Sequence, residues 1–141
     1  MRAAANPLWR MPGEGMAIPG IGTLKLSAAE TGGAFEMIEF SGPNAPPHLH
    51  RARDETFFVL HGSFTFRLAD EVVAAPAGSC VFVPRGVHHG FTLQPGSRAL
   101  LVIAPAGLEG YFRELGRALE AGRSGGDIRR ALADRYDSIP I

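Results

Sequence analysis

Short apolar runs separated by glycine- and proline-containing turns are the feature that most constrains the fold of this chain. In the run Phe64–Leu68, apolar and polar residues alternate, which is the pattern of a β-strand with one buried face. Repeated short strands of this kind favour a β-sandwich or a β-barrel. We expect strands at Gly22–Leu26, Phe35–Phe40, Glu55–Leu60, Phe64–Leu68, Val72–Ala74, Ser79–Val83, His89–Leu93 and Ala99–Ile103.

The spacing of apolar residues changes after Pro105, where it becomes three and four instead of two. This spacing predicts an amphipathic helix with one apolar face. Asp127 is expected to cap a second short helix that runs to about Arg135. The apolar face of the first helix covers the outside of the β-domain or contacts a partner subunit. Its members are Leu108, Tyr111, Phe112, Leu115 and Leu119.

These patterns divide the chain into three segments. Residues 1–17 form an irregular N-terminal arm, in which Trp9 packs on the domain or on a second subunit. Residues 18–105 form the β-domain, and residues 106–141 form a helical tail. A chain of 141 residues suits one domain of typical size. The sequence therefore predicts an all-β, single-domain protein with a short C-terminal helical segment.

Charge and hydropathy argue against several classes of partner. Fourteen basic and fourteen acidic side chains give a formal net charge of zero, which offers no strong field to nucleic acid or anionic lipid. No apolar stretch has the length of a signal peptide or a membrane span, so we expect a cytoplasmic protein that binds neither nucleic acid nor a membrane. The single cysteine, Cys80, is expected to be a small buried side chain.

Four of the five histidines fall in two clusters that suggest metal ligands. His48 and His50 are two residues apart, which places both imidazoles on the same face of a strand. Glu55 opens the next strand, and a hairpin there can return its carboxylate to the two rings. The second cluster, His88 and His89, would supply a nitrogen from a distant strand. Histidines and a carboxylate that converge from separate strands are typical ligands of a borderline divalent metal ion.

The spacing within both clusters resembles the two motifs of the cupin superfamily. The first cluster is G-x5-H-x-H-x4-E-x6-G from Gly42 to Gly62, and the second is G-x5-P-x-G-x2-H from Gly78 to His89. The helical tail is similar to that of small single-domain bacterial cupins described as quercetin-dioxygenase-like. The resemblance implies a single cupin barrel, which is a double-stranded β-helix or jelly roll. The second motif of the family usually ends with an asparagine where this chain has Leu93, which affects a local turn or strand contact and not a metal ligand.

The resemblance also implies which residues hold the metal and which do not. It makes His48, His50, Glu55 and His89 the ligands of one divalent ion. Adjacent strand residues face opposite ways, so only one of His88 and His89 can point inward, and the family spacing selects His89. His61 precedes a turn glycine and is expected to be solvated. Three arginines lie near the motifs, and we expect them to be solvated loop charges; the alternative is that they guard the mouth of the site. They are Arg51, Arg53 and Arg85.

Strand parity predicts an apolar substrate pocket above the metal. Phe57 and Val59 share the parity of Glu55, and Phe91 shares that of His89, so these three side chains are expected to point inward. A β-bulge would invert this assignment. Eight of the nine phenylalanines lie between Phe35 and Phe91, and most of them are expected to form the core.

The implied ligand set favours particular metals and reactions. Four protein ligands leave two positions on a six-coordinate ion, so iron, manganese, nickel or cobalt would keep room for substrate and dioxygen. Zinc with four ligands is usually closed and would need Glu55 to swing away or the shell to expand. A loosened Glu55 would also be able to act as a catalytic general base.

The leading functional hypothesis is a metal-dependent dioxygenase that acts on a small, apolar, oxygenated substrate, either aromatic or polyketide-like. One alternative is a non-redox cyclase or isomerase, and another is a metal-bound cupin that binds or senses a small molecule. A structural role fits poorly with an intact ligand set. The resemblance also implies a homodimer.

Overall fold

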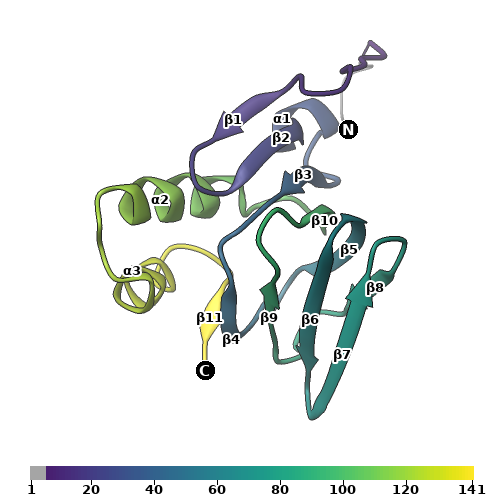
Figure 1. The fold of residues 1–141 in the computed structure, drawn as a ribbon. Coiled ribbons are helices and arrows are strands. Elements are labelled where there is room, and N and C mark those ends of the chain that lie inside the picture. Colours follow the sequence, from purple (N-terminus) through teal and green to yellow (C-terminus); the bar gives the residue numbers. More distant parts are fainter. Residues whose placement is uncertain (1–5) are drawn as a thin grey trace.

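The computed structural model describes residues 6–141, which form two antiparallel β-sheets facing each other (Figure 1). The larger sheet has the order β1-β2-β3-β10-β5-β8, and the smaller has the order β11-β4-β9-β6-β7. This arrangement is a jelly roll, the all-β fold class that the sequence predicts. The strands are β1 Met16–Ile18, β2 Gly22–Leu26, β3 Glu36–Phe40, β4 Ala45–Leu49, β5 Asp54–His61, β6 Ser63–Leu68, β7 Glu71–Pro76, β8 Cys80–Val83, β9 His89–Leu93, β10 Arg98–Ala104 and β11 Ile139–Pro140.

Strand alternation fills the space between the sheets with aromatic side chains. Phe64 and Phe66 of β6 are buried, while the alternate residues Thr65 and Arg67 are exposed. Inward-facing rings from both sheets meet in the middle, such as Phe57 and Phe66, whose centroids are 5.0 Å apart. Such tilted aromatic contacts add to the stabilisation that burial of the rings provides. The eight strands expected from the apolar runs are all present, with ends that differ by a few residues.

Cys80 is the clearest error among the expected core residues, because the structure exposes it. Val81 and Val83 point into the core, so the period of two turns Cys80 and Phe82 outward. An apolar run on a strand with one solvated face does not bury every member.

Three strands and one short helix lie outside the expected set. β1 pairs with β2, so the irregular arm expected over residues 1–17 gives way to a strand at Met16, and residues 1–5 of that arm lie outside the described residues. The helix α1, Ala28–Thr31, begins with a capping box between Ser27 and Glu30. Strand β4 contains Pro46 and Pro47, which have no N–H group to donate to a neighbouring strand. For this reason the sequence pattern did not predict β4.

Gly90 explains how a proline-containing strand packs against the sheet. β4 pairs with β9 at Ala45–Phe91 and His48–His89, with an irregularity between the two pairs. A Cβ atom on Gly90 would lie 2.7 Å from the main-chain oxygen of Ala45, so only glycine permits this approach. The close contact brings the His48 region of β4 beside β9.

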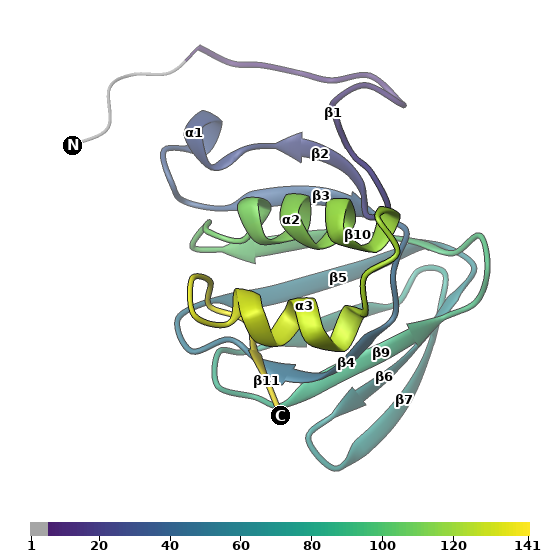
Figure 2. The same cartoon turned by 90° about the vertical axis from the view of Figure 1, so that its left-hand side faces the viewer.

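The C-terminal tail packs on the β-domain of its own chain, one of the two arrangements that the sequence left open. Helix α2, Glu109–Glu120, buries its apolar face and lies in front of β3 and β10 in Figure 2. At its start, the buried carboxylate of Glu36 accepts hydrogen bonds from the main-chain N–H groups of Gly107, Leu108 and Glu109. These bonds satisfy amides that a helix leaves unpaired at its N-terminus.

The second tail helix begins earlier than the sequence predicts. Helix α3, Gly125–Leu132, is capped by Ser124, whose hydroxyl accepts from the main-chain N–H of Asp127. The expectation that Asp127 is the cap is therefore wrong. Both residues are good caps, and Ser124 occupies the position before the first turn. Asp127 instead forms an ion pair with Arg130.

Beyond α3 the chain returns to the smaller sheet as β11 (Figure 2). Ile139 pairs with Leu49 and Pro140 pairs with His48. The tail therefore ends against the strand that carries the first predicted metal ligand. None of the helices within residues 6–141 has the length and hydropathy needed to cross a membrane.

Candidate metal centre

The structure brings the four predicted ligands together between the two sheets. His48 lies on β4, His50 directly follows that strand, Glu55 lies on β5 and His89 lies on β9. One potential ligand atom from each residue lies within 4.8 Å of those of the other three. Three separate segments of the chain therefore meet at one point, at a spacing that a single ion can bridge.

Local pairing explains how the ligands come together. His48 and His89 are direct partners in the β4–β9 ladder, and their ring centroids are 4.2 Å apart. Glu55 approaches from the opposing larger sheet. The turn after β8 is tied to the end of β4 because the main-chain N–H of Gly86 donates to the main-chain oxygen of His50. Gly86 and His89 of the second motif therefore help to position His50 and His48 of the first motif.

Each imidazole is oriented by a main-chain carbonyl. The Nδ1 atom of His48 lies 2.8 Å from the oxygen of Pro46, that of His89 lies 2.9 Å from Val87, and that of His50 lies 2.6 Å from Asp137. A carbonyl can only accept, so each Nδ1 carries the hydrogen. The three Nε2 atoms are then the coordinating atoms, as in metal sites whose histidines are held by outer hydrogen bonds.

The contacts of Glu55 show why this cluster needs a cation. Its Oε1 atom lies 3.0 Å from Nε2 of His50 and 2.9 Å from Nε2 of His89. If Nδ1 holds the only proton of each ring, both Nε2 atoms present lone pairs to a carboxylate. Such an arrangement is repulsive unless protons or a metal ion lie between the groups. A divalent ion would satisfy all the facing lone pairs at once.

Because the cluster is buried, the charges within it must balance. Glu55 is 3% exposed and His89 is 1% exposed. An isolated carboxylate at such a depth would be costly, so it must be compensated by nearby positive charge. Burial acts to raise the pKa of Glu55, but the charge and hydrogen bonds of His50 and His89 outweigh it and lower the pKa. Glu55 is therefore ionised and ready to bind a cation.

The histidines differ in how readily they take a proton. Burial, together with the charge of His89, lowers the pKa of His48 to about 4, so its imidazole is neutral at neutral pH. For His50, burial acts to lower the pKa, but the Glu55 carboxylate and Asp137 outweigh it and raise the pKa. His50 is thus the ligand whose proton a metal ion must displace.

A small cavity of about 30 Å³ adjoins the cluster. Of the three residues predicted to line a substrate pocket, Phe57 and Phe91 line this cavity, whereas Val59 is buried in the core and is not among its lining residues in the described chain. This volume has room for one or two water molecules. The remaining lining residues come largely from outside the cupin motifs.

The C-terminal tail supplies one wall of this cavity. Tyr111 and Phe112 of α2, Arg129 of α3, and Ser138 just before β11 all line it. The sequence assigned Tyr111 and Phe112 only to the apolar face of a helix, and it gave no signal for Arg129 or Ser138. The hydrogen bond from His50 to the Asp137 carbonyl ties the same tail directly to the ligand set.

The other histidines and arginines singled out in the sequence lie outside the cluster. His88 and His61 are exposed, as expected. Arg85 pairs with Asp54, and Arg53 pairs with Asp137. The Asp137 carboxylate also accepts from the main-chain N–H groups of two loop residues, Arg51 and Ala52. Arg53 and Asp137 therefore fix the loop between His50 and Glu55 to the tail.

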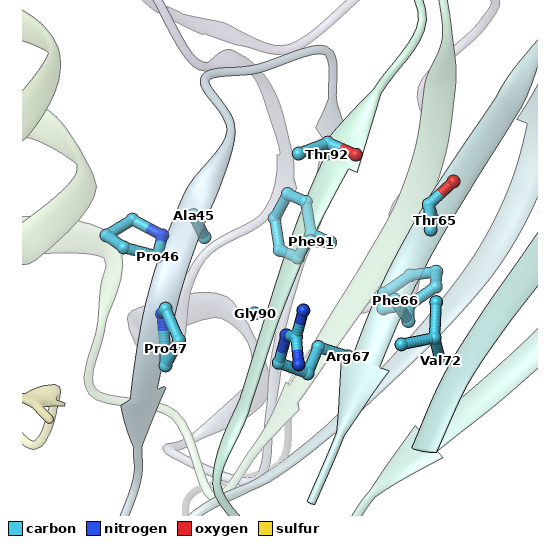
Figure 3. A pocket seen from close by; sticks show the side chains of 10 residues that line it. All are labelled: Ala45, Pro46, Pro47, Thr65, Phe66, Arg67, Val72, Gly90, Phe91 and Thr92. Carbon is cyan, nitrogen blue, oxygen red and sulfur yellow. The ribbon is translucent and has the colours of Figure 1, made fainter. Parts of the chain in front are cut away.

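A separate groove of about 230 Å³ lies on the outer side of the smaller sheet. Figure 3 shows it between Pro46 and Pro47 of β4 on one side and the β6–β7 pair on the other, with β9 between them. The four ligand-type side chains are not among its lining residues within the described part of the chain. The groove is therefore distinct from the candidate metal centre.

Comparisons with known proteins agree with this architecture. Residues 35–104 match the family Cupin_2, described as a cupin domain. A search of curated proteins finds no match for the sequence. Among solved structures, KdgF from Halomonas sp. is 22% identical with a TM-score of 0.51, over 60% of this chain and 76% of that one.

Two further solved structures share the fold. The Streptomyces protein Pac13, described as a unique nucleoside dehydratase, is 21% identical with a TM-score of 0.52, over 66% of this chain and 76% of that one. A predicted oxalate decarboxylase from Thermotoga maritima is 23% identical with a TM-score of 0.50, over 60% of this chain and 78% of that one. The match over residues 35–104 and these neighbours agree on the fold of this chain, which is the cupin jelly roll.

Proposed function

We propose that this protein is a metal-dependent enzyme that acts on a small oxygen-bearing substrate, with dioxygenase chemistry as the leading reaction. The observation that carries the proposal is the convergence of three carbonyl-anchored imidazoles and one buried carboxylate within 4.8 Å. These residues fit a divalent ion in number, type and orientation. His48, His50, Glu55 and His89 would hold that ion.

The ligand set favours metals that accept six ligands. Four protein atoms on such an ion leave two positions for substrate and dioxygen, so we favour iron, manganese, nickel or cobalt over zinc. Three neutral imidazoles and one carboxylate around a divalent cation leave a net charge of about plus one, which stabilises an ionised oxygen such as an enolate or phenolate. That stabilisation is the chemistry that the metal supplies.

The protein residues position the substrate and exclude water. Phe57 and Phe91 give the cavity an apolar wall next to the ligands, and the tail covers its remaining side. An apolar, covered site strengthens electrostatic interactions with a bound substrate. In a dioxygenase reaction both atoms of O₂ enter the product and the substrate supplies the electrons, so no external reductant is required.

Glu55 is better suited to the role of ligand than to that of base. Its pKa is lowered by His50 and His89, and a carboxylate that holds protons so weakly is a poor general base at neutral pH. The catalytic role suggested by the sequence would require Glu55 to leave the imidazoles first. We therefore propose Glu55 as a metal ligand whose charge balances the ion.

A non-redox reaction is the second candidate. The cavity is lined by Tyr111, Arg129 and Ser138, which make it more polar than a purely apolar substrate requires. Polar groups of this kind suit a cyclisation, isomerisation or elimination as well as an oxygenation. The solved neighbours include a nucleoside dehydratase and a predicted oxalate decarboxylase, so this fold accommodates several reactions.

Oxygen consumption distinguishes the two candidates. The protein is loaded separately with iron, manganese, nickel, cobalt and zinc, and O₂ uptake is measured with flavonol and catechol-like substrates. The dioxygenase proposal predicts one O₂ consumed per substrate converted, with one of the first four metals. Turnover that is indifferent to oxygen, above all with zinc, supports the non-redox candidate. Binding without turnover would instead indicate a binding or sensing protein.

A further inference from the structure

A half-buried arginine faces the candidate metal centre from the C-terminal tail. Arg129 of α3 lines the same cavity as His48, His50 and Glu55. Its Nη2 atom donates to the main-chain oxygen of Asn44 at 3.0 Å. No carboxylate within residues 6–141 forms an ion pair with it. Its charge is thus held beside the cavity by a neutral acceptor.

Three carboxylates on α3, on the tail and in the ligand cluster are engaged elsewhere. Asp127, on the same helix, pairs with Arg130. The Asp137 carboxylate pairs with Arg53 and accepts two main-chain N–H groups. Glu55 faces the imidazoles. The positive charge of Arg129 therefore remains available to an anion that enters the cavity.

Two hydroxyl groups stand beside this arginine. Tyr111 and Ser138 are both buried and both line the cavity. Burial raises the pKa of the Tyr111 phenol, although Ser138 and Arg129 act in the opposite direction, so the phenol keeps its proton and can donate. A guanidinium beside a hydroxyl donor is a favourable site for a carboxylate, whose two oxygens can each accept a hydrogen bond.

The metal centre adds a second positive region to the same space. With the ion bound, the ligand cluster would carry about plus one, and Arg129 adds a further unit charge to the lining of the same cavity. Two positive regions in one cavity match a substrate with two oxygen-bearing ends, one of them fully ionised. Because the cavity of about 30 Å³ has room for only one or two water molecules, a substrate that reaches both regions must be short and must widen the cavity as it binds.

From this placement we propose that Arg129, with Tyr111, binds a carboxylate group of the substrate while the metal holds a second oxygen. The proposal rests on the proposed function, because it requires an ion at the four ligands. It gives the substrate class as short carboxylic acids with a second oxygen donor. It also assigns the tail a role in specificity, since Tyr111 and Arg129 both lie outside the cupin motifs.

Anion binding to the cobalt-loaded protein tests this proposal. The probes are azide, which needs only the metal, and the dicarboxylates oxalate, malonate, succinate and glutarate, which differ in reach. Binding is followed by the visible spectrum of Co(II) and by calorimetry, and dialysis checks that cobalt stays bound. We expect at least one dicarboxylate to bind more tightly than acetate.

Neighbouring arginines provide matched variants. Arg129→Gln is expected to weaken the best dicarboxylate about tenfold or more, the scale of a lost charged hydrogen bond, without changing azide binding. Arg129→Lys is expected to restore part of the loss, and Tyr111→Phe to weaken binding severalfold. Arg130→Gln, on the exposed side of the same helix, should behave as the wild type. Thermal melting of each cobalt-loaded variant checks that the tail remains folded.

The outcomes separate this inference from the proposed function. Equal dicarboxylate affinity in Arg129→Gln and Arg130→Gln would overturn the role of Arg129 while normal azide binding left the metal centre intact. Tighter binding of inorganic phosphate than of every dicarboxylate would overturn the assignment of a carboxylate. Failure of wild-type protein to retain cobalt, or of azide to change its spectrum, would count against the metal centre itself.

Discussion

At the scale of single residues, two adjacent histidines offer a direct comparison. His88 is exposed and His89 is 1% exposed, so they occupy similar sequence positions but opposite faces of the chain. His89→Ala is expected to lower the affinity for a divalent metal by about tenfold or more, because it removes a ligand. His88→Ala should leave the affinity unchanged. Calorimetric titration with Mn²⁺ and Ni²⁺ measures both, and equal losses in the two variants would be inconsistent with the proposed ligand set.

His50 determines how metal binding depends on pH. Its folded-state pKa lies above the ordinary value of 6.5, because Glu55 and Asp137 outweigh the effect of burial. The stability that its proton contributes to the metal-free protein is complete below about pH 6.5 and is lost as pH rises through the folded pKa. A metal ion must displace that proton, so metal affinity rises over the same interval.

This pH dependence has a measurable form. We expect the increase in Tm caused by one equivalent of Ni²⁺ to be larger at pH 8 than at pH 6, and binding to release protons into the buffer. Calorimetry in two buffers with different ionisation enthalpies measures that release. A metal affinity that is flat between pH 6 and pH 8, with no proton release, would refute the assignment of His50 as a protonated ligand.

At the scale of elements, the sequence patterns predicted some of the strands that form the site and missed others. The apolar runs predicted β5 and β9. The cupin-like spacing then selected Glu55 and His89 as inward-facing, and parity with Glu55 predicted that Phe57 is buried. The prolines of β4 hid that strand, because they remove the N–H groups by which a strand is normally paired. The spacing of His48 and His50 compensated for this loss, since a shared motif carries geometry that strand propensity does not.

The C-terminal tail contributes the part of the cavity that the sequence did not predict. Its apolar stripe predicted a helix that packs on the β-domain or on a partner subunit, but not that the helix lines the cavity beside the ligands. Arg129 shares α3 with one other arginine, Arg130, and no sequence pattern distinguishes the one that lines the cavity. The packing of α3 against α2 and β11, with β11 paired to β4, makes that distinction.

The start of α2 depends on a single buried carboxylate. Glu36 accepts three main-chain N–H groups there, so Glu36→Ala is expected to cost about 1–3 kcal/mol by leaving buried donors unpaired. Glu39→Ala on the same strand removes only a partly exposed ion pair with Arg98 and should cost about 0–1 kcal/mol. Urea denaturation measures the free energy of unfolding of each. A cost for Glu36→Ala no greater than that for Glu39→Ala would contradict the anchoring role.

At the scale of the whole molecule, the homodimer implied by the resemblance stays a prediction. The outer side of the larger sheet exposes two aromatic side chains, Phe58 at 43% and Phe82 at 58%, on the neighbouring strands β5 and β8. Apolar side chains gathered on one face often mark an interface. We expect sedimentation equilibrium to give a dimer, and the double variant Phe58→Ser, Phe82→Ser to shift it toward monomer. A monomeric wild-type protein would remove the prediction.

The fold of the whole molecule does not by itself determine which reaction the protein catalyses. The jelly roll places two sheets around one enclosed centre, and the four ligands use both sheets and the turn between them. Neighbours with this fold have different described activities, so the fold alone does not choose the reaction. The choice depends on the metal and on the groups that the tail adds to the cavity.

Elemental analysis of protein purified without added metal tests the central claim most directly. The account predicts close to one equivalent of a single divalent metal per chain in the wild type, retained in His88→Ala and lost in the double variant His50→Ala, His89→Ala. A metal content near zero in folded wild-type protein that also fails to take up added Fe²⁺, Mn²⁺, Ni²⁺ or Co²⁺ would contradict it.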